Sequence, residues 1–332
     1  MKRIAIVVLD WNGADDTIEC LSCLNNFLLY DIYLLDNASS KENIQRVTDY
    51  LQSRFKNELS IIHDKSFTKD IESRVINYIL SSENLGFAVG NNFVVSKIVE
   101  KYQFVLLLNN DTVVPDGTIE HLFQTACEQD TVALTCDIRL YYNTEELWNA
   151  GGIFAFYGDR KYFSQNHIDN LRLRGVKYIN AEFITGCALL IQTAYIKKYG
   201  LFTDSFFHGE DDFNFCYKLK KNNQKVGVDL AVTLYHKVGR SIQRVSSNDK
   251  NYSKMLVHFA NRVIDFKEFY SKPKWLAWRN MYLFLLFVRK ITTGMPVKIA
   301  WLLIKRIKSV SDQNDQVKKP LFDKLMGLTW DV

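Results

Sequence analysis

The sequence lacks two kinds of segment, a membrane-spanning helix and a secretory signal. No run reaches the roughly 18 apolar residues that a spanning helix needs, although 47% of the 332 residues are hydrophobic. The apolar run Ile4–Leu9 is stopped by Asp10. It is too short for the core of a signal peptide, and no small-residue cleavage site follows it. We therefore expect a cytoplasmic globular protein in which Ile4–Leu9 forms the first strand.

The cysteines argue against a zinc site. Of the six, Cys20 and Cys23 form a single Cys-x-x-Cys pair, and a zinc site would need a second pair at metal spacing. Both lie in Asp15–Phe27, a segment with helical periodicity, so we expect them to pack one face of a helix. Free thiols fit a reducing cytoplasm.

Two common phosphate-binding loops are also absent. Gly86 and Gly90 do not have the G-x-G-x-x-G spacing, no glycine-rich turn follows the first strand, and there is no Walker loop. A dinucleotide-binding fingerprint is therefore not supported. With 24% charged residues, the chain has the composition of an ordinary globular protein, and its length allows one large α/β domain with or without an appendage.

Strands and helices alternate over roughly the first 130 residues, which is typical of a doubly wound, largely parallel sheet. The predicted strands are Ile4–Leu9, Ile32–Leu35, Leu59–His63, Val75–Leu80 and Phe104–Leu108. The predicted helices are Asp15–Phe27, Glu42–Phe55, a segment ending near Lys101, and Thr118–Glu128. Beyond Glu128 we expect strands at Thr131–Cys136, Ile138–Tyr142, Val176–Ile184, Ala188–Ile191 and Val226–Val232, a short helix at Tyr195–Tyr199, a turn at Trp148–Gly152, and an irregular polar stretch from there to Arg174.

Polar residues follow the first strands at their carboxyl ends. Phe104–Leu108 has five apolar residues in a row, as expected of a strand buried on both faces, and Asn109-Asn110-Asp111-Thr112 follows it. Asp10 and Asp36 end two earlier strands. Ligands of open α/β sheets bind outside these strand ends, and a single carboxylate suits a hard divalent cation shared with a phosphorylated ligand. The alternative is a simple polar turn, which commonly follows a strand.

His236 and Arg240 come shortly after the last predicted strand. The position of His236 near a strand end predicts a role in binding metal or phosphate, and Arg240 could meet phosphate through two hydrogen bonds. A lone histidine is more often a surface residue or a satisfied core residue, so this alternative stays open.

A third polar stretch is Glu210-Asp211-Asp212, which stands between Phe206-Phe207 and Phe213. Adjacent carboxylates repel one another, and burial together with this repulsion raises at least one pKa, as a general base requires. The alternative is a helix N-terminus, where acidic residues meet the helix dipole favourably. The apolar flanks favour the functional interpretation.

The segment 272–308 carries nine basic residues and no acidic one, whereas the whole chain has a net charge of +5, so the remaining residues carry −4. Basic amphipathic helices of this kind lie on anionic membrane surfaces, and Trp275, Trp278 and Trp301 suit such an interface. The alternatives are helices that pack on the preceding α/β domain or form a homodimer. No recognition motif supports nucleic-acid binding.

Taken together, these stretches resemble family 2 glycosyltransferases of the GT-A fold, in the rhamnosyltransferase-like branch. The matching segments occur in the family's order across about residues 4–241: Val7–Gly13 with Cys20-Leu21, Asp36–Ser39, Glu83–Asn92, Leu108–Thr112, Thr185–Ala188, Gly200–Phe202, Phe206-Phe207, Glu210–Asp212 and His236. The resemblance implies an α/β, Rossmann-like, mostly parallel sheet flanked by helices. It implies a catalytic domain over 1–245, divided at about residue 130 into a nucleotide-sugar half and an acceptor half, and a helical extension over 246–332.

The resemblance also implies roles for individual residues. Asp111 is the last carboxylate of the family's metal motif, and His236 lies near Mg²⁺ or Mn²⁺ and the diphosphate. Asp212 is the base, with Asp211 in that role if the alignment slips by one residue, and Glu210 belongs to the same catalytic turn. The residues expected to bind the nucleotide-diphosphate sugar donor are Asp10, Asn12, Asp36, Asn37, Asn84, Gly86, Asn92, Asn109, Asn110 and Arg240.

The implied activity is sugar transfer with inversion to a glycan or lipid-linked acceptor in bacterial surface polysaccharide synthesis, with rhamnose the branch's common sugar. Two departures from the family pattern stand out, Asn109 in place of an aspartate and Asp10 in the first turn. With Asn214 at a frequently acidic position, Asn109 also allows a catalytically silent binding protein of the same fold. A sugar nucleotidyltransferase is the enzymatic alternative.

Overall fold

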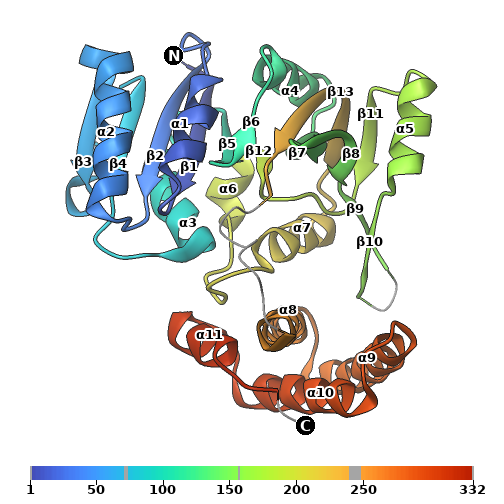
Figure 1. Cartoon of the computed structure of the whole chain (residues 1–332). Helices are drawn as coiled ribbons and strands as arrows, with labels where there is room; N and C mark the ends of the chain where they lie inside the picture. The colour runs from blue at the N-terminus through green and yellow to red at the C-terminus, as the bar shows by residue number, and fades with distance from the viewer. Residues whose placement is uncertain (1, 71–73, 156–157, 239–247, 331–332) are drawn as a thin grey trace.

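The structure, a computed structural model, describes residues 2–70, 74–155, 158–238 and 248–330. A central eleven-stranded sheet has helices on its faces, and a layer of C-terminal helices lies below one face of the sheet, next to α7 (Asp211–Lys221) (Figure 1). This arrangement confirms the expected α/β class with a mixed, mostly parallel sheet and a helical C-terminal extension.

The first half of the chain forms the parallel part of the sheet. Its strands lie in the order β5-β1-β2-β4-β3, and every neighbouring pair is parallel. The near-continuous apolar sequences of β1 and β5 are buried on both faces, as central parallel strands require. The strands are β1 (Ile4–Asp10), β2 (Tyr30–Asp36), β3 (Leu59–His63), β4 (Ile76–Leu80) and β5 (Phe104–Asn109), with helices α1 (Ala14–Ser22), α2 (Lys41–Phe55), α3 (Gly86–Ile98) and α4 (Thr118–Glu128) and short 3₁₀ turns at Lys56–Glu58 and Asp64–Ser66.

The second half adds strands of mixed direction. β12 (Ala188–Gln192) lies antiparallel between β5 and β7 (Ala133–Leu140). β13 (Val226–His236) is parallel to β7, and both β11 (Tyr178–Ala181) and β6 (Thr112–Val113) pair with it in the antiparallel sense. α6 (Thr193–Tyr199) follows β12 as predicted. The mixed directions bring the start of β12 and the end of β13 to the edge where β5 ends.

Four sequence-based predictions in this half, and one in the first, are wrong. The strand expected at Val176–Ile184 is the shorter β11, Tyr178–Ala181, which pairs with β13 only over these four residues. The two strands expected on either side of Asp137 are one strand, β7, because Asp137 is buried in ion pairs with Arg139 and Arg172 instead of marking a turn. The expected turn and irregular stretch contain β8 (Asn143–Asn149), β9 (Gly152–Phe154), β10 (Arg160–Tyr162) and α5 (Gln165–Leu173). β13 extends four residues beyond its predicted end, and α1 stops at Ser22, before the predicted Phe27.

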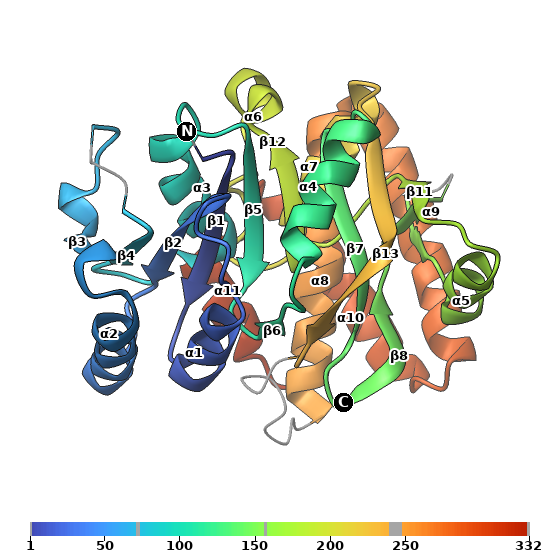
Figure 2. The same ribbon diagram turned by 90° about the horizontal axis from the view of Figure 1, so that it is seen from above.

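The C-terminal layer consists of α8 (Asn248–Phe269), α9 (Lys272–Thr292), α10 (Val297–Gln313) and α11 (Lys319–Met326), with a hydrophobic core of its own. Viewed from above, α8, α9 and α10 lie beneath the half of the sheet that contains β7 and β13 (Figure 2). Among the described residues, no helix is both long and apolar enough to cross a bilayer.

Two of the three tryptophans that suggested a membrane interface are core residues. Trp278 stacks between Phe266 and Tyr282, at ring-centroid distances of 4.4 and 5.1 Å, and Trp275 donates its indole N–H to the carbonyl of Val263 (2.8 Å). These two side chains stabilise the helical layer, since both are less than 10% exposed. Trp301 is 63% exposed and is the only one of the three available to a partner.

Candidate functional site

Three carboxylates lie at the carboxyl ends of neighbouring strands, as the sequence predicts. Asp10 on β1 pairs in register with Asp36 on β2, and Leu9 pairs with Asn109 at the end of β5, two residues before Asp111. The strand order therefore gathers these side chains along one edge of the sheet. This is the edge at which open α/β sheets bind ligands.

Asp10 organises the first turn from inside the protein. It is fully buried, and Oδ1 accepts hydrogen bonds from the backbone N–H of Gly13 (2.9 Å) and from Asn110 Nδ2 (3.3 Å), while Oδ2 accepts from Asn43 Nδ2 (2.7 Å). Burial raises the pKa of this carboxyl, although the hydrogen bonds from Asn43 and Gly13 act in the opposite direction. The aspartate that departs from the family pattern thus fastens the ends of β1 and β5 together.

Asp36 has an acceptor atom left over. Its Oδ1 accepts from the backbone N–H of Ser39 (2.9 Å), whereas Oδ2 is buried with no hydrogen-bond partner, and burial raises the pKa of the carboxyl. Asn12 lies across the same edge, where its Oδ1 accepts from the backbone N–H of Ser40 (2.8 Å). Trp11 next to it is 58% exposed. The Asp36 carboxyl itself is enclosed by the protein and lies near the Tyr78 hydroxyl, whereas the exposed Trp11 ring suits stacking with a planar base.

Asparagine amides fasten the loop before α3 to this edge. Asn37 Oδ1 accepts from the N–H of Leu85 (2.8 Å), and Asn84 Oδ1 accepts from the N–H of Gly86 (2.9 Å). Gly86 has φ of +76°, and a Cβ there would lie 2.8 Å from the carbonyl oxygen of Phe207. A glycine is therefore required both by the backbone conformation and by the close approach of the second half of the chain.

Two further predicted donor-binding asparagines are engaged with protein atoms. Asn92 exchanges two hydrogen bonds with the backbone of Phe202 (2.9 and 3.1 Å). Asn110 donates to Thr17 Oγ1 (2.9 Å) as well as to Asp10. The first set of contacts fastens α3 to the segment after α6, and the second fastens α1 and the end of β1 to the end of β5. Contact of either residue with a donor stays a prediction.

Asp111 and His236, 125 residues apart, are neighbours. His236 Nε2 lies 2.9 Å from Asp111 Oδ1, with the two side chains 7% and 17% exposed. β6 and β13 create the contact, because Thr112 pairs with His236 and the N–H of Lys237 donates to the carbonyl of Asp111 (3.0 Å). The imidazole also packs edge-on against Trp148, at a centroid distance of 4.3 Å.

This pair fits a metal that is shared with a ligand. Across residues 2–70, 74–155, 158–238 and 248–330 there is no group of three or more His, Cys, Asp or Glu side chains that could hold an ion. Mg²⁺ sites often use one or two protein carboxylates and complete their coordination with substrate phosphates and water. Asp111 supplies the carboxylate, and His236 retains a buried Nδ1 without a hydrogen-bond partner. The residues present therefore fit a divalent cation held jointly with a diphosphate.

The acidic turn contains one residue with a structural role, Glu210. Gly209 and Glu210 both have positive φ, +82° and +73°, and they redirect the chain into α7. Glu210 forms a buried ion pair with Arg160 of β10 in which both side chains are at most 3% exposed. Burial raises the pKa of Glu210, but the positive charges of Arg160 and Arg262 outweigh it, so the net pKa is lowered. Its carboxylate is committed to this pair.

Asp211 and Asp212 differ in exposure. Asp211 is 3% exposed, its Oδ1 has no partner, and burial, together with the charges of Asp212 and Glu210, raises its pKa well above the usual value. Asp212 is half-buried, and its Oδ2 accepts from the backbone N–H of Gly186 (3.1 Å). Burial raises its pKa too, while that hydrogen bond lowers it. Asp212 thus combines access with a raised pKa, which are the properties of a general base at neutral pH.

Asn214 has a structural reason to replace an acid. Its Nδ2 donates to Asp265 Oδ1 (2.6 Å) and to Glu268 Oε2 (2.9 Å) on α8. An aspartate at this position would place a third carboxylate against two others at a buried site. The departure from the family pattern at Asn214 therefore follows from how α8 packs on α7.

Two hydrogen bonds connect the Asp111–His236 pair to Asp212 through the loop 185–187. The N–H of Asn109, two residues before Asp111, donates to the carbonyl of Cys187 (2.8 Å), and the N–H of the preceding residue, Gly186, donates to Asp212. Gly186 also faces Phe87 at the start of α3, since a Cβ on Gly186 would lie 3.1 Å from that ring. The loop 185–187 therefore lies between the end of β5, the start of α3 and the start of α7.

Some residues of this arrangement were not predicted from the sequence. Arg160 lies in a stretch interpreted as irregular, Trp148 was assigned to a turn, and the buried Lys237 pairs with Asp16 and Glu19 of α1. Two of these residues could have been suspected from the sequence. Trp148 lies close to the glycine pair Gly151-Gly152, and Lys237 directly follows His236. The predicted phosphate ligand Arg240 lies outside the described residues.

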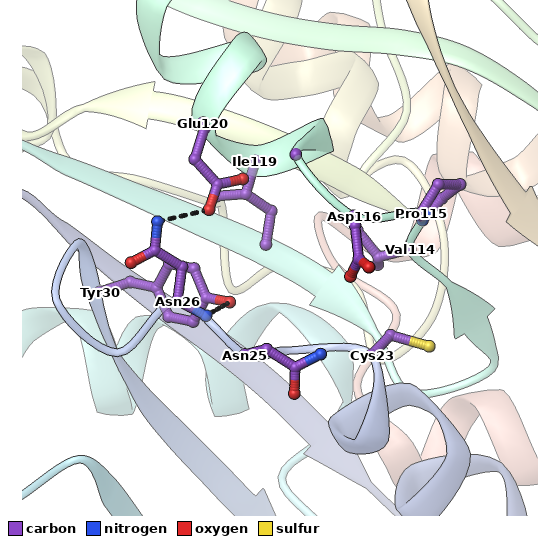
Figure 3. A pocket seen from close by; sticks show the side chains of 10 residues that line it. Cys23, Asn25, Asn26, Tyr30, Val114, Pro115, Asp116, Ile119 and Glu120 are labelled. Atoms are coloured by element: carbon purple, nitrogen blue, oxygen red, sulfur yellow. Dashed lines mark hydrogen bonds between the residues drawn. The ribbon is translucent and has the colours of Figure 1, made fainter.

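A cavity of about 310 Å³ lies elsewhere, between the end of α1 and the start of α4 (Figure 3). Its polar groups satisfy one another, with Asn26 Nδ2 donating to Glu120 Oε1 (2.6 Å) and the N–H of Asn26 donating to the Tyr30 hydroxyl (2.9 Å). None of the predicted site residues lines it. We assign no function to this cavity.

Comparison with known proteins identifies the fold and the family. Among solved structures, the chain is similar to GalNAc-T7 in complex with UDP, GalNAc and Mn²⁺, with a TM-score of 0.58 and 15% sequence identity. The match covers 93% of this chain and 54% of GalNAc-T7, so this chain spans about half the length of that protein. It is also similar to the mannosyltransferase PcManGT from Pyrobaculum calidifontis in complex with GDP-Man and Mn²⁺ (TM-score 0.51, 12% identity, 98% of this chain and 85% of that one). No curated protein sequence matches the chain. The model of the family described as glycosyltransferase-like family 2 matches residues 3–252. The chain therefore belongs to glycosyltransferase-like family 2 and has the GT-A fold.

Proposed function

We propose that this protein is an inverting, metal-dependent glycosyltransferase that moves a sugar from a nucleotide diphosphate to an acceptor hydroxyl. The observation that carries the proposal is the connection between the Asp111–His236 pair and the half-buried Asp212 through Asn109, Cys187 and Gly186. It brings a metal-binding pair and a candidate base to the same edge of the sheet. Asp36 ends the neighbouring strand at that edge, and its Oδ2 has no hydrogen-bond partner of its own in the protein.

The donor is a nucleotide-diphosphate sugar bound together with Mn²⁺ or Mg²⁺. The solved relatives carry UDP or GDP-mannose with Mn²⁺, and the carboxylate–imidazole pair formed here suits such a cation. The ion would be held by Asp111 and His236, and it would offset negative charge on the departing diphosphate. Asp36 would bind the base or ribose.

In the transfer step, Asp212 takes the proton of the acceptor hydroxyl as the oxygen attacks the anomeric carbon. The new carbon–oxygen bond forms on the face opposite the departing diphosphate, and the anomeric carbon–phosphate oxygen bond breaks with its electron pair leaving on the diphosphate. One displacement inverts the configuration. The raised pKa of Asp212 makes its carboxylate a stronger base than an exposed aspartate.

The acceptor is a glycan or a lipid-linked sugar, and the branch resemblance makes rhamnose in bacterial surface polysaccharide the first case to test. An exposed aromatic ring supports a sugar acceptor. Tyr162 is 53% exposed and packs against Phe183 and Phe213, the residue that follows Asp212. Apolar sugar faces stack on such rings.

The test is release of nucleotide diphosphate from a panel of UDP-, GDP- and dTDP-sugars, with Mn²⁺, Mg²⁺ or EDTA and a set of hydroxyl acceptors. We expect release from one donor, loss in EDTA, and a fall of roughly 10²–10⁴-fold in Asp212→Asn. Asp116→Asn is the matched control, because Asp116 is exposed and follows the same strand end. A donor that binds, as measured by calorimetry, without release from any combination would instead favour a catalytically silent member of the fold.

A further inference from the structure

The α9–α10 hairpin exposes an unusual concentration of apolar side chains. Six of the fifteen large hydrophobic residues exposed among the described residues fall within 281–301. We define these six as the hairpin face: Met281 (43% exposed), Phe284 (66%), Leu285 (42%), Val288 (43%), Val297 (58%) and Trp301 (63%). Burying them inside the protein would stabilise it, so their common exposure suggests a partner.

The hairpin face is continuous across the two helices. On α9, its residues recur at the i, i+3, i+4 and i+7 spacing that places them on one side of a helix. On α10, Val297 and Trp301 are one turn apart. The ring of Trp301 contacts that of Phe287, which precedes Val288 on α9, at a centroid distance of 6.3 Å, so the two helices are neighbours at this face.

Exposed lysines share the α10 side of this face. At 100° per residue, Lys298, Lys305 and Lys308 project within about 100° of Val297 and Trp301 around the helix axis. All three are exposed, and none has an ion-pair partner within the described residues. The segment 272–308 contains no acidic residue. Within 272–308 the apolar surface is therefore flanked by basic side chains only, and the next acidic residue of α10, Asp312, is paired with Arg279.

We propose that the hairpin face docks on the surface of an anionic lipid bilayer. Aromatic and aliphatic side chains would enter the boundary between headgroups and acyl chains, while the lysines meet negative headgroups. α9 and α10 lie on the far side of the layer from the sheet (Figure 1), so docking leaves the strand-end site free. The helices would lie on the bilayer without crossing it, consistent with the absence of a membrane-spanning helix in the described ranges.

Charge distinguishes this partner from a second copy of the chain. A twofold dimer brings the same patch of both protomers together, so it would press against each other two faces that both carry the positive charges of Lys298, Lys305 and Lys308. No carboxylate within 272–308 offsets this repulsion. An anionic bilayer supplies the opposite charge over the whole face.

The test is co-sedimentation of the full chain with vesicles, without donor or acceptor, so that its result is independent of sugar transfer. Vesicles of phosphatidylcholine alone are compared with vesicles containing phosphatidylglycerol, at low and high salt. We expect binding to the anionic vesicles to exceed binding to neutral ones by at least tenfold and to weaken in high salt, because exposed charges are screened. Equal binding to both vesicles, or no binding to either, overturns the proposal.

Matched variants distinguish binding through the hairpin face from nonspecific hydrophobic adsorption. Phe284→Ser/Trp301→Ser should lower the vesicle partition coefficient roughly tenfold or more, whereas Leu28→Ser/Leu173→Ser, which removes two side chains that are 92% and 86% exposed elsewhere, should leave it unchanged. Thermal melts check that all variants fold. An equal loss in the control pair overturns the proposal.

Two further measurements complete the design. Lys298→Gln/Lys305→Gln/Lys308→Gln should reduce binding to anionic vesicles and leave the weak binding to neutral ones unchanged. Light scattering of the wild type should give a monomer mass at micromolar concentration. A dimer that is lost in Phe284→Ser/Trp301→Ser would assign the hairpin face to self-association and refute lipid docking.

Discussion

Replacing Arg160 by methionine should destabilise the protein without changing its surface. Arg160 and Glu210 form an ion pair in which the side chains are 3% and 1% exposed, and the guanidinium also lies 3.2 Å from the ring centroid of Phe213. Arg160→Met leaves the Glu210 carboxylate buried without its partner, which costs about 3–5 kcal/mol for such pairs. With an unfolding entropy of roughly 2.1 cal/mol/K per residue over 332 residues, this corresponds to a fall in melting temperature of about 4–7 °C.

The assay is calorimetric melting of Arg160→Met, Glu210→Gln and the double variant at pH 7. If the pair is the interaction that matters, the double variant should lose about 2–3 kcal/mol less than the sum of the two single losses, because the second substitution removes the charge that the first leaves unpaired. Lys197→Met is the control. It breaks the more exposed pair with Glu100 (2.7 Å; side chains 36% and 69% exposed) and should cost less than about 1 kcal/mol.

Additive losses within about 0.5 kcal/mol would refute this reasoning, since they would mean that Arg160 and Glu210 contribute independently. The dependence of stability on pH gives a second test. Because the pKa of Glu210 is lowered in the folded protein, the stabilisation is present above the unfolded-state pKa and is lost as the pH falls through the lower folded value. The wild type and Arg160→Met should therefore converge in stability in acid.

The remaining predictions concern the site and the helical layer. Asp211→Asn should stabilise the protein at pH 8 and have no effect on stability below about pH 4. The reason is that the raised pKa of Asp211 costs stability only as the pH rises above the pKa of this group in the unfolded chain. Guanidinium titrations at both pH values measure this, and a loss of stability at pH 8 would contradict it. Asp111→Asn should weaken donor binding at least tenfold in Mn²⁺ and leave it unchanged in EDTA, as measured by calorimetry, so an equal effect in both conditions would exclude a metal role. Gly86→Ala should cost about 1–3 kcal/mol because of its positive φ and the close carbonyl of Phe207, and a neutral melt would contradict this. Trp278→Ala should cost about 3–5 kcal/mol, as for other core tryptophans, and a small effect would argue against its packing role.

The C-terminal layer contributes to the site through α8 as well as through its own core. Asn261 Nδ2 donates to the carbonyl of His208 (3.0 Å), and Arg262 pairs with Asp159 next to Arg160 (2.7 Å). Asp265 accepts from Asn214. The turn that carries the candidate base is thus held from both β10 and α8, which gives the extension a structural reason to accompany the catalytic domain.

Local patterns determined most of the fold. The apolar runs of β1, β2 and β5 and the periodicity of α2 and α4 specify their elements directly, because each buries a continuous surface and ends at a polar residue. The polar residues at strand ends were also recognisable, since parallel strands must end at one edge. The membership in the glycosyltransferase family follows from these same segments in order.

Only the tertiary structure decided which polar residues are available to a ligand. Asp10 and Asp36 look alike in sequence, yet the oxygens of Asp10 are occupied by neighbouring chain segments and Oδ2 of Asp36 has no partner. Glu210 and Asp212 also look alike in sequence, but Arg160, 50 residues away along the chain, forms an ion pair with Glu210 alone. Likewise, burial divided Trp275 and Trp278 from Trp301. Long-range contacts of this kind depend on which strands and helices become neighbours, and no local pattern of hydrophobicity or charge carries that information.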